Sequence, residues 1–282
     1  MSAFNSPPFV LATLGYYSPP ADGGKPYQKG VVDPSTGIRS LERNWFPIDV
    51  PGIAIENARG REHEVSLDKT GFAFFHHVSK HTSFENEDNV KTAYYLESAE
   101  LLKKLTGANR VEIFDHTVRK SNLGPGVENL IYGPVSMVHI DQSNDASVAR
   151  VHLHMPAADV PKLLSKRFQI INLWRPIHHT ALDYPLALCD SRSVDPTDIV
   201  PVKLIFPDRV GELLSVKHSE KHKWWYLRGM TPDDIVLIKC YDSVQDGSVA
   251  VATPHTAFYD PTAPDGAIPR ESIELRALVF YD

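Results

Sequence analysis

The run SMVHIDQS, residues 136–143, places a histidine and an aspartate two positions apart at the end of an apolar stretch. In a β-strand, side chains at positions i and i+2 point to the same face of the sheet. His139 and Asp141 therefore predict a strand that carries two metal ligands on one face. The chain contains thirteen histidines, so such triplets also arise by chance, and His218 with Glu220 forms another one. The surrounding sequence has to decide between a metal site and an accident.

A third ligand is available in the run VATPHTAFYDP, residues 251–261, a strand-like stretch that contains His255. Two histidines and one carboxylate leave three positions open on a non-haem Fe(II), enough for a bidentate cosubstrate and O₂. Only a short loop would separate His218 from His255, whereas several barrel strands normally separate the ligands of such a site. We therefore predict that His139, Asp141 and His255 bind the metal and carry the catalysis.

The run PRESIELRALVFY, residues 269–281, has the strict alternation of a β-strand. Its polar side chains would share one face, opposite an apolar face; they are Arg270, Ser272, Glu274 and Arg276. A dicarboxylic keto acid needs a fixed cation for its distal carboxylate, and the planar fork of arginine suits that task. Arg270, Ser272 and Arg276 are thus candidate cosubstrate-binding residues. The alternative is an exposed edge strand with a solvated polar face.

A second run, NLWRPI at residues 172–177, offers further candidates for the same cavity. Asn172 and Trp174 would share one face of a strand, and Arg175 would take the other. Asn172 is a candidate hydrogen-bond partner of the cosubstrate, and Arg175 is a candidate partner of the cosubstrate or of a substrate carboxylate. Trp174 and Trp224 are candidate substrate contacts. The alternative for each residue is structural, as a buried arginine–aspartate pair or a core tryptophan.

Two other polar pairs are expected to be structural. His152 and His154, in the run VHLHM at residues 151–155, would share a strand face, as paired metal ligands do in cupins. A capping role just before Pro156 is the favoured interpretation. His116 and Arg119, in the run FDHTVRK at residues 114–120, would lie on opposite faces of a strand. Neither is assigned to the site.

Composition and charge exclude several classes of protein. The net charge of −6 and the pI near 6.1 argue against a nucleic-acid partner, which would favour a basic face. Two cysteines are too few for a disulfide framework, so a reducing compartment is favoured. The N-terminus lacks a secretory signal pattern, and no apolar run approaches the length of a membrane span. We expect a cytoplasmic protein without a membrane partner, and the sequence leaves a homodimer open.

Most of the chain is predicted to form strands, since twenty-two prolines disfavour an all-helical fold. The clearest helix spans 90–107 and stops at Gly107, and a shorter one spans 157–166. The predicted strands are 110–118, 133–140, 168–176, 202–206, 223–229, 234–241 and 272–281. This pattern predicts a mainly β fold, of α+β type, in which helices pack outside a β-sandwich or barrel.

Several motifs together resemble a known family. The order His-x-Asp, distant histidine and Arg-x-Ser is similar to that of the Fe(II)/2-oxoglutarate-dependent oxygenases, and the spacing from Arg270 to Arg276 resembles that of their nucleic-acid dealkylases. A closer resemblance is to the fungal group named for gibberellin desaturase and the aspergillic-acid hydroxylase, with the cephem methoxylase as a relative. The motifs that carry it are ENARGREHEVSLDKTGF, LTGANRVEIFDHTVR, VHIDQS, NLWRPI, PLALCDSRSV, PHTAFYDP and RESIELRALVFY.

The resemblance implies a double-stranded β-helix, or jelly-roll, core of the cupin-like kind. It also implies Fe(II) on the predicted triad, with 2-oxoglutarate as cosubstrate and O₂ as oxidant. The substrate would be a small fungal secondary metabolite that is hydroxylated or desaturated, with release of succinate and CO₂. The chain would form one domain over 1–282. Within it, an N-terminal arm and strands would occupy 1–90, the helix 90–107, and the core 110–282, with an insertion over the barrel mouth near 177–232.

Two other functions compete with the oxygenase. A non-redox metalloenzyme, an isomerase or a hydrolase, could use the same triad on a cupin-like barrel. A barrel that has lost its chemistry could bind a ligand or a partner enzyme. The first would have no use for Arg270 and Ser272, and the second would not be expected to retain all three metal ligands.

Overall fold

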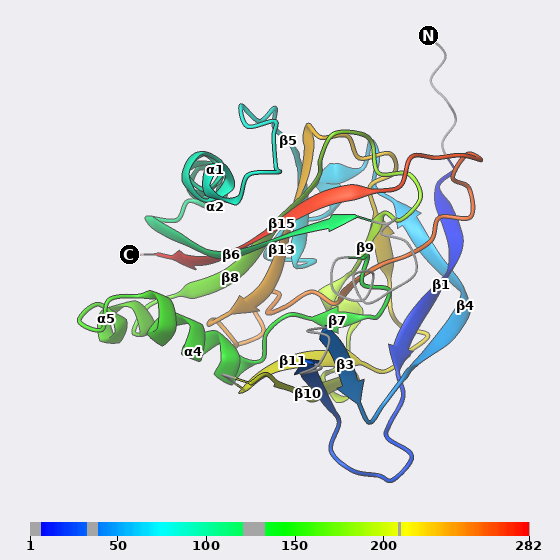
Figure 1. Ribbon diagram of the computed structural model, residues 1–282, viewed down its shortest axis with the longest axis horizontal. Helices are drawn as coiled ribbons and strands as arrows, with labels where there is room; N and C mark the ends of the chain where they lie inside the picture. Colours follow the sequence, from blue (N-terminus) through cyan, green and yellow to red (C-terminus); the bar gives the residue numbers. More distant parts are fainter. Residues whose placement is uncertain (1–6, 33–38, 121–132, 208–209, 282) are drawn as a thin grey trace.

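The protein is described here by a computed structural model that covers residues 7–32, 39–120, 133–207 and 210–281. Two β-sheets make up most of it, with helices outside them, so the predicted mainly β fold is confirmed (Figure 1). No helix in these ranges is long and apolar enough to cross a membrane.

The smaller sheet has five strands. In spatial order they are β5 (Phe72–His76), β13 (Asp234–Asp242), β8 (Phe168–Pro176), β15 (Glu271–Phe280) and β6 (Arg110–Lys120). All four neighbouring pairs are antiparallel. Every residue of β8 and β13 is buried, because both faces of this sheet are covered. The three predicted strands at 110–118, 168–176 and 272–281 agree with β6, β8 and β15 to within two residues.

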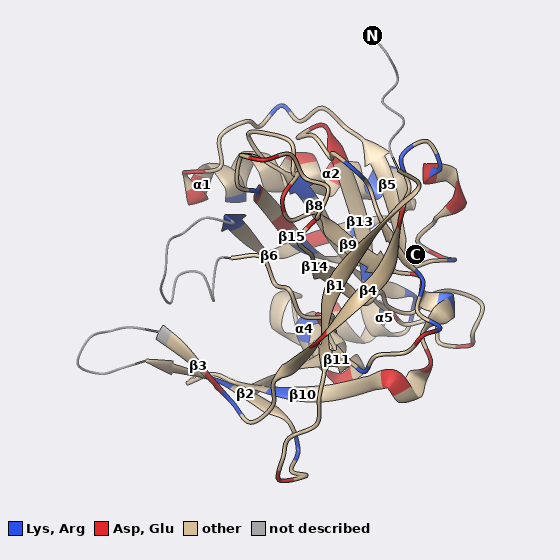
Figure 2. Ribbon diagram, turned by 90° about the vertical axis from the view of Figure 1, so that its right-hand side faces the viewer, with Lys and Arg blue, Asp and Glu red and all other residues tan. Residues whose placement is uncertain are grey.

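The larger sheet has ten strands, several of them short. In spatial order they are β1 (Phe9–Tyr17), β4 (Pro47–Asn57), β12 (Trp224–Tyr226), β9 (Leu186–Cys189), β14 (His255–Ala257), β7 (His139–Ile140), β11 (Val210–Val216), β10 (Ile199–Ile205), β2 (Tyr27–Val32) and β3 (Arg39–Arg43). β2, β3 and β10 extend as a ribbon away from the rest of the molecule (Figure 2). The short β7 and β14 lie side by side in the middle of this order, and they contain His139 and His255.

Helices cover the outer face and one end of the smaller sheet. The helical segments are α1 (Glu87–Asn89), a π-helical turn (Val90–Tyr94), α2 (Tyr95–Thr106), α4 (Asn144–His154) and α5 (Val160–Leu164). Three short 3₁₀ turns lie at Glu62–Glu64, Ser191–Ser193 and Pro196–Asp198. The predicted helix 90–107 is confirmed, and Gly107 ends it in the left-handed conformation at φ 74° that glycine adopts most easily.

The alternation of β15 separates two environments. Its apolar residues, which are Ile273, Leu275, Ala277 and Val279, pack with Leu102 of α2 in one hydrophobic cluster. Its polar residues face the interior between the sheets, where a second cluster joins Trp174 of β8 to Leu188 of β9. Because β15 lies between β8 and β6, it is not an edge strand. The alternative interpretation, a solvated polar face, is therefore wrong.

Two sequence predictions need correction. The segment 177–232 was expected to be an insertion over the barrel mouth, but it supplies strands to the larger sheet: β9 pairs with β14, and β11 pairs with β7. These pairings join residues far apart in sequence, so local patterns do not reveal them. His152 and His154 lie on helix α4 rather than on a strand. Residues two apart do not share a helix face, so they do not form a cupin-like pair.

An ion-pair network lies at the C-terminal end of β13; its members are Lys239, Asp242, Asp68 and Arg167. Lys239 is fully buried, and its Nζ lies 2.8 Å from both Asp68 Oδ1 and Asp242 Oδ2. Arg167 also binds both carboxylates, at 2.8 and 2.7 Å. Gln169 Nε2 donates to Asp242 at 2.7 Å. Each charge in this network has an opposite partner, which buried charges require.

Replacing Asp242 should therefore remove the buried partner of Lys239 and Arg167 and leave both cations with only the half-exposed Asp68. We expect Asp242→Ala to lower the free energy of unfolding by about 3–5 kcal/mol, the usual cost of breaking a buried ion pair. Urea unfolding followed by circular dichroism measures this change. Asp246→Ala, on the exposed loop that follows, is the control and should change stability by less than about 0.5 kcal/mol. Equal effects of the two substitutions would contradict the role given to the network.

Candidate active site

The two candidate histidines are direct cross-strand partners. His139 begins β7 and His255 begins β14, and the register of this antiparallel pair places one opposite the other. Cross-strand partners point to the same face of a sheet, and here their ring centroids are 4.5 Å apart. Asp141 follows β7 directly, two residues after His139, so its side chain turns to the same side. The long gap between His139 and His255 in sequence is thus closed by one strand pairing.

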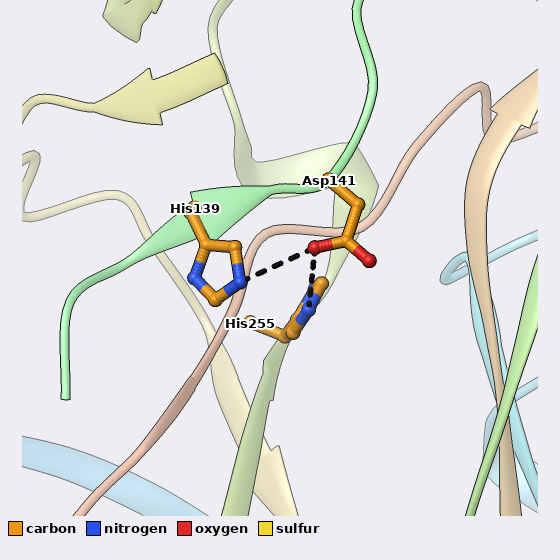
Figure 3. A group of neighbouring side chains, drawn as sticks. All are labelled: His139, Asp141 and His255. Carbon is orange, nitrogen blue, oxygen red and sulfur yellow. Dashed lines mark ion pairs between the residues drawn. The ribbon is translucent and has the colours of Figure 1, made fainter. Parts of the chain in front are cut away.

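The three side chains converge on one point (Figure 3). Asp141 Oδ1 lies 3.4 Å from His139 Nε2 and 3.9 Å from His255 Nε2, and all three ligand atoms lie within 4.8 Å of one another. Donors at neighbouring positions of one metal, each at about 2.0–2.2 Å from it, lie about 3–3.5 Å apart, close to the separation of Asp141 and His139. Two imidazoles and one carboxylate are also the donor set of a non-haem Fe(II) with open positions. The residues present fit that metal.

Backbone carbonyls fix which histidine nitrogen faces the metal position. His139 Nδ1 lies 2.7 Å from the carbonyl oxygen of Met137, and His255 Nδ1 lies 3.0 Å from that of Thr253. A carbonyl oxygen only accepts hydrogen bonds, so each Nδ1 carries a proton, and in the neutral form of each ring Nε2 has the free lone pair. Burial, followed by the neighbouring His139, lowers the pKa of His255 and favours this neutral form. Both rings are therefore ready to bind a metal.

Asp141 is held by its other oxygen. Asn172 Nδ2 donates to Asp141 Oδ2 at 2.7 Å, and Arg276 Nε donates to the same atom at 2.9 Å. Oδ1 alone is then turned towards the histidines. Burial opposes ionisation of Asp141, but the neighbouring charge of Arg276 outweighs it and holds the pKa of this carboxyl well below its usual range. The carboxylate is charged and oriented before any metal arrives.

A cavity opens between the two sheets beside the histidines. Its lining residues are Arg119, Val135, His139, Trp174, Leu186, His255, Thr256, Ala257, Arg270 and Glu274. Arg270 is 1 % exposed, and its guanidinium carbon lies 5.7 Å from the centre of the Trp174 ring. Its Nη1 donates to the carbonyl oxygen of Tyr184 at 2.9 Å. Metal ligands and a buried arginine thus border the same space.

Two polar atoms at the arginine end lack a hydrogen-bond partner. They are Nε of Arg270 and Oγ of Ser272, both buried on the inner face of β15. Burial, together with the charge of Arg119, lowers the pKa of Arg270 to about 10. Buried polar groups are normally paired, so orphaned donors beside a cavity indicate a missing acceptor. An anionic ligand would satisfy both.

Comparisons with known proteins agree with this geometry. A family described as "Oxidoreductase/YMDC permease-like domain" matches residues 14–280. The hydroxylase/desaturase CTB9 of Cercospora beticola is 33% identical over 298 residues, which cover 98% of this chain and 88% of the relative. The Fe(II)/2-oxoglutarate-dependent dioxygenase nvfI of Aspergillus novofumigatus is 33% identical over 257 residues, which cover 88% of this chain and 89% of the relative.

The chain belongs to the fungal Fe(II)/2-oxoglutarate-dependent oxygenase family. A solved structure supports this on the fold as well: that of the iron and α-ketoglutarate-dependent endoperoxidase NvfI superimposes with a TM-score of 0.80 at 29% identity, covering 98% of this chain and 99% of that one. The family resemblance inferred from the sequence motifs is thereby confirmed.

The structure of the oxygenase divides the predicted cosubstrate residues into two groups. Arg270 lines the cavity and Ser272 lies two residues along the chain, and both carry a buried polar atom without a hydrogen-bond partner among the described residues. Asn172 and Arg276 are paired with each other across β8 and β15, and both bind Asp141. Arg276 also contacts Glu274 at 3.3 Å and Asp115 at 3.1 Å. Its guanidinium is occupied by carboxylates, so it positions a ligand instead of awaiting one.

The predicted substrate-contacting residues also divide into one that lines the cavity and two that do not. Trp174 lines the cavity. Arg175 points to the opposite face of the smaller sheet, where it lies over the Tyr94 ring and contacts His77 Nδ1 at 3.0 Å. Trp224 is buried in a separate hydrophobic cluster, and its Nε1 donates to the hydroxyl of Tyr16 at 2.9 Å. Neither is among the residues that line this cavity, which favours the structural interpretation of both.

One cavity residue escaped the sequence analysis. Arg119 was expected to be structural, yet it borders the cavity together with Arg270. Its place follows from the register of β6 with β15, which sets Arg119 opposite Ser272. The alternation of β6 placed Arg119 on one face of a strand, but no local pattern predicted which strand would pair with β6 or that this face would border the cavity.

The two donors to Asp141 should control metal binding. We expect Arg276→Met and Asn172→Leu each to weaken Fe(II) binding about 10- to 100-fold, because the carboxylate loses its orientation and is free to rotate or to bind through both oxygens. Anaerobic titration with Fe(II) against a competing chelator measures the affinity. Arg175→Met, which removes a buried arginine from the outer face of the same sheet, is the control and should leave Fe(II) affinity unchanged. Unaltered affinity in both folded variants would refute the positioning role.

Proposed function

We propose that this oxygenase hydroxylates or desaturates a C–H bond of a small secondary metabolite, with 2-oxoglutarate and O₂ as cosubstrates and succinate and CO₂ as products. Fe(II) would be held by His139 Nε2, Asp141 Oδ1 and His255 Nε2. Bound iron supplies the redox chemistry that activates O₂. The protein contributes binding, orientation and exclusion of water.

The observation that carries the proposal is a pair of buried, unsatisfied groups beside the cavity that His139, His255 and Arg270 line: one on Arg270, directly before β15, and one on Ser272 within β15. Arg270 Nε and Ser272 Oγ are buried donors without an acceptor, and the distal carboxylate of 2-oxoglutarate would provide one. Its keto acid end would then reach the open positions beside His139 and His255. A non-redox metalloenzyme on the same triad would have no use for this second anchor.

Each residue of the chain has a defined task in this scheme. The two histidines present neutral Nε2 atoms because their Nδ1 protons are bound to backbone carbonyls. Asp141 offers one oxygen only, which leaves three positions for the keto acid and O₂. Trp174 supports the Arg270 guanidinium through a cation–π contact.

We also propose that the two facing sheets form a jelly-roll core, since β7 and β14 of one sheet face β8 and β15 of the other across the cavity. The relatives' names support the reaction class but differ in outcome: CTB9 is called a hydroxylase/desaturase and NvfI an endoperoxidase. A cytoplasmic location and a homodimer are further proposals, which fractionation and light scattering would test.

The first experiment is an anaerobic titration of metal-free protein with Fe(II) and then with 2-oxoglutarate. We expect a weak visible charge-transfer band that requires both additions, because a keto acid that chelates Fe(II) through two oxygens absorbs there. His139→Ala and Asp141→Ala should lose the band and all turnover while circular dichroism shows an intact fold. Retention of the band or of turnover in either variant would remove that residue from the metal site.

The two arginines of β15 should have separable effects. We expect Arg270→Ala to raise the 2-oxoglutarate concentration needed for half-maximal band intensity by about 10-fold or more, since a charge-assisted contact is lost. Its Fe(II) affinity should stay unchanged. Arg276→Ala should instead weaken Fe(II) binding, because this arginine is bound to Asp141. The reverse pattern in the two titrations would mean that Arg276 is the cosubstrate anchor.

A further inference from the structure

A groove lies beside α2, which packs outside the smaller sheet (Figure 1). It runs between the helical segment 90–106 and residues 77–81, which follow β5, and it has a volume of about 560 Å³. The helical segment contributes Ala93, Glu97 and Lys104, whose spacings of four and seven place them on one helix face. This volume is typical of sites for small organic molecules. The groove is therefore large enough to hold a ligand of its own.

A buried arginine lies beneath the groove. Arg175 of β8 is 2 % exposed, and its guanidinium carbon lies 5.6 Å from the centre of the Tyr94 ring. Its Nη1 donates to the carbonyl oxygen of Pro232 at 3.2 Å, and its Nη2 lies 3.0 Å from Nδ1 of His77. Buried charges normally have an opposite partner, yet no carboxylate of the described residues lies within ion-pair distance of Arg175. Its positive charge is therefore not compensated by a neighbouring anion.

This arginine determines which nitrogen of His77 carries the proton. A guanidinium only donates hydrogen bonds, so Nδ1 of His77 accepts one from Arg175, and Nε2 carries the proton. Burial, followed by the charge of Arg175, lowers the pKa of His77 and favours the neutral ring. Nε2 lies 3.9 Å from Oε1 of Glu97, which is too far for a hydrogen bond. His77 thus lines the groove with an N–H donor that has no acceptor among the described residues.

The charges along the groove favour a negatively charged ligand. Glu97 accepts a hydrogen bond from the backbone N–H of Lys80 at 3.1 Å, and Glu100 is paired with Lys103 at 2.8 Å. The ammonium groups of Lys80 and Lys104 have no ion pair within 4.0 Å in the part of the chain that the structure describes. These two lysines and the buried arginine outnumber Glu97, so the groove carries an excess of positive charge.

We propose that this groove is a second ligand site, which binds an organic carboxylate with an apolar body. The carboxylate accepts a hydrogen bond from His77 Nε2 and lies between the ammonium groups of Lys80 and Lys104. Val78, which is 63 % exposed, and Leu101 provide the apolar wall for the rest of the ligand. The site is independent of the proposed function, because the metal ligands border a different cavity on the other face of the smaller sheet.

The test uses 1-anilinonaphthalene-8-sulfonate, an organic anion whose fluorescence rises in apolar surroundings. It is titrated into the full chain and then displaced with octanoate or with octan-1-ol, which has the same chain length but no charge. We expect one saturable site for the probe. Octanoate should displace the probe at a concentration about 10-fold or more below that of octan-1-ol, because charge-assisted hydrogen bonds are made only by the carboxylate.

Two tryptophan variants locate the probe. Ala93 is an exposed helix residue that lines the groove, so Ala93→Trp fills the groove without disturbing the core. We expect it to raise the dissociation constant of the probe by about 10-fold or more, since contacts with the apolar wall are lost. Leu96→Trp is the matched control, because Leu96 is 70 % exposed and lies outside the groove. Its dissociation constant should equal that of the unmodified protein.

A second pair of variants tests the charge. Lys104→Met should raise the concentration of octanoate needed for displacement by about 5- to 10-fold and leave that of octan-1-ol unchanged. Lys91→Met is the control, since Lys91 lies on the same helical segment, is paired with Glu87 at 2.6 Å and does not line the groove. Circular dichroism shows whether each variant is folded.

Four outcomes would overturn the inference. They are the absence of saturable probe binding, undiminished binding by Ala93→Trp, equal displacement by octanoate and octan-1-ol, and displacement of the probe by Fe(II) with 2-oxoglutarate. The last outcome would place the probe in the cavity beside the metal ligands. None of the four bears on the proposed function, because its charge-transfer band is measured without the probe.

Discussion

The structure depends on the contact between Asp141 and its two donors, Asn172 and Arg276. Asp141 follows β7 of the larger sheet, whereas Asn172 and Arg276 lie on β8 and β15 of the smaller one. The contact therefore joins the two sheets at the same point at which it orients a metal ligand. Arg276 is only 13 % exposed in its side chain and is surrounded by carboxylates, which raise its pKa against the effect of burial. Removal of Asp141 or of Arg276 would take away a buried partner charge from the other residue. The contact between them therefore stabilises both the fold and the site.

The polarity of the cavity follows from that contact. Arg276 contacts Asp141 and Glu274, whereas the buried Arg270, which we propose as the cosubstrate anchor, lines the cavity without an ion pair among the described residues. In the function that we propose, a dicarboxylic keto acid bound in this cavity would be oriented by charge. Its distal carboxylate would face Arg270, and its keto acid end would face the two neutral histidines. The charges along the cavity would therefore complement those of the metal and of the dicarboxylic cosubstrate.

Local sequence patterns predicted much of this arrangement, for reasons that individual elements make clear. The alternation in β15 separated Arg270 and Ser272 from the apolar residues that pack on α2, and this period-two signal needs no knowledge of the partners. The helix that ends at Gly107 was also predicted from local sequence. In contrast, the long spacing between Asp141 and His255 predicts an insertion at 177–232, whereas the structure pairs β9 and β11 of this segment with β14 and β7, and such long-range pairing leaves no local pattern.

The sequence by itself determined the types of the metal ligands, their order, and the polar face that would serve the cosubstrate. It did so because these features depend on residue identity and on the alternation of a single strand. Only the tertiary structure decided which strands become neighbours. The pairing of β7 with β14 brings His139 opposite His255, and the pairing of β6 with β15 brings Arg119 to the cavity. The pairing of β8 with β15 also places Arg276 opposite Asn172, where both donate to Asp141, since register between distant strands is set by packing of the whole core.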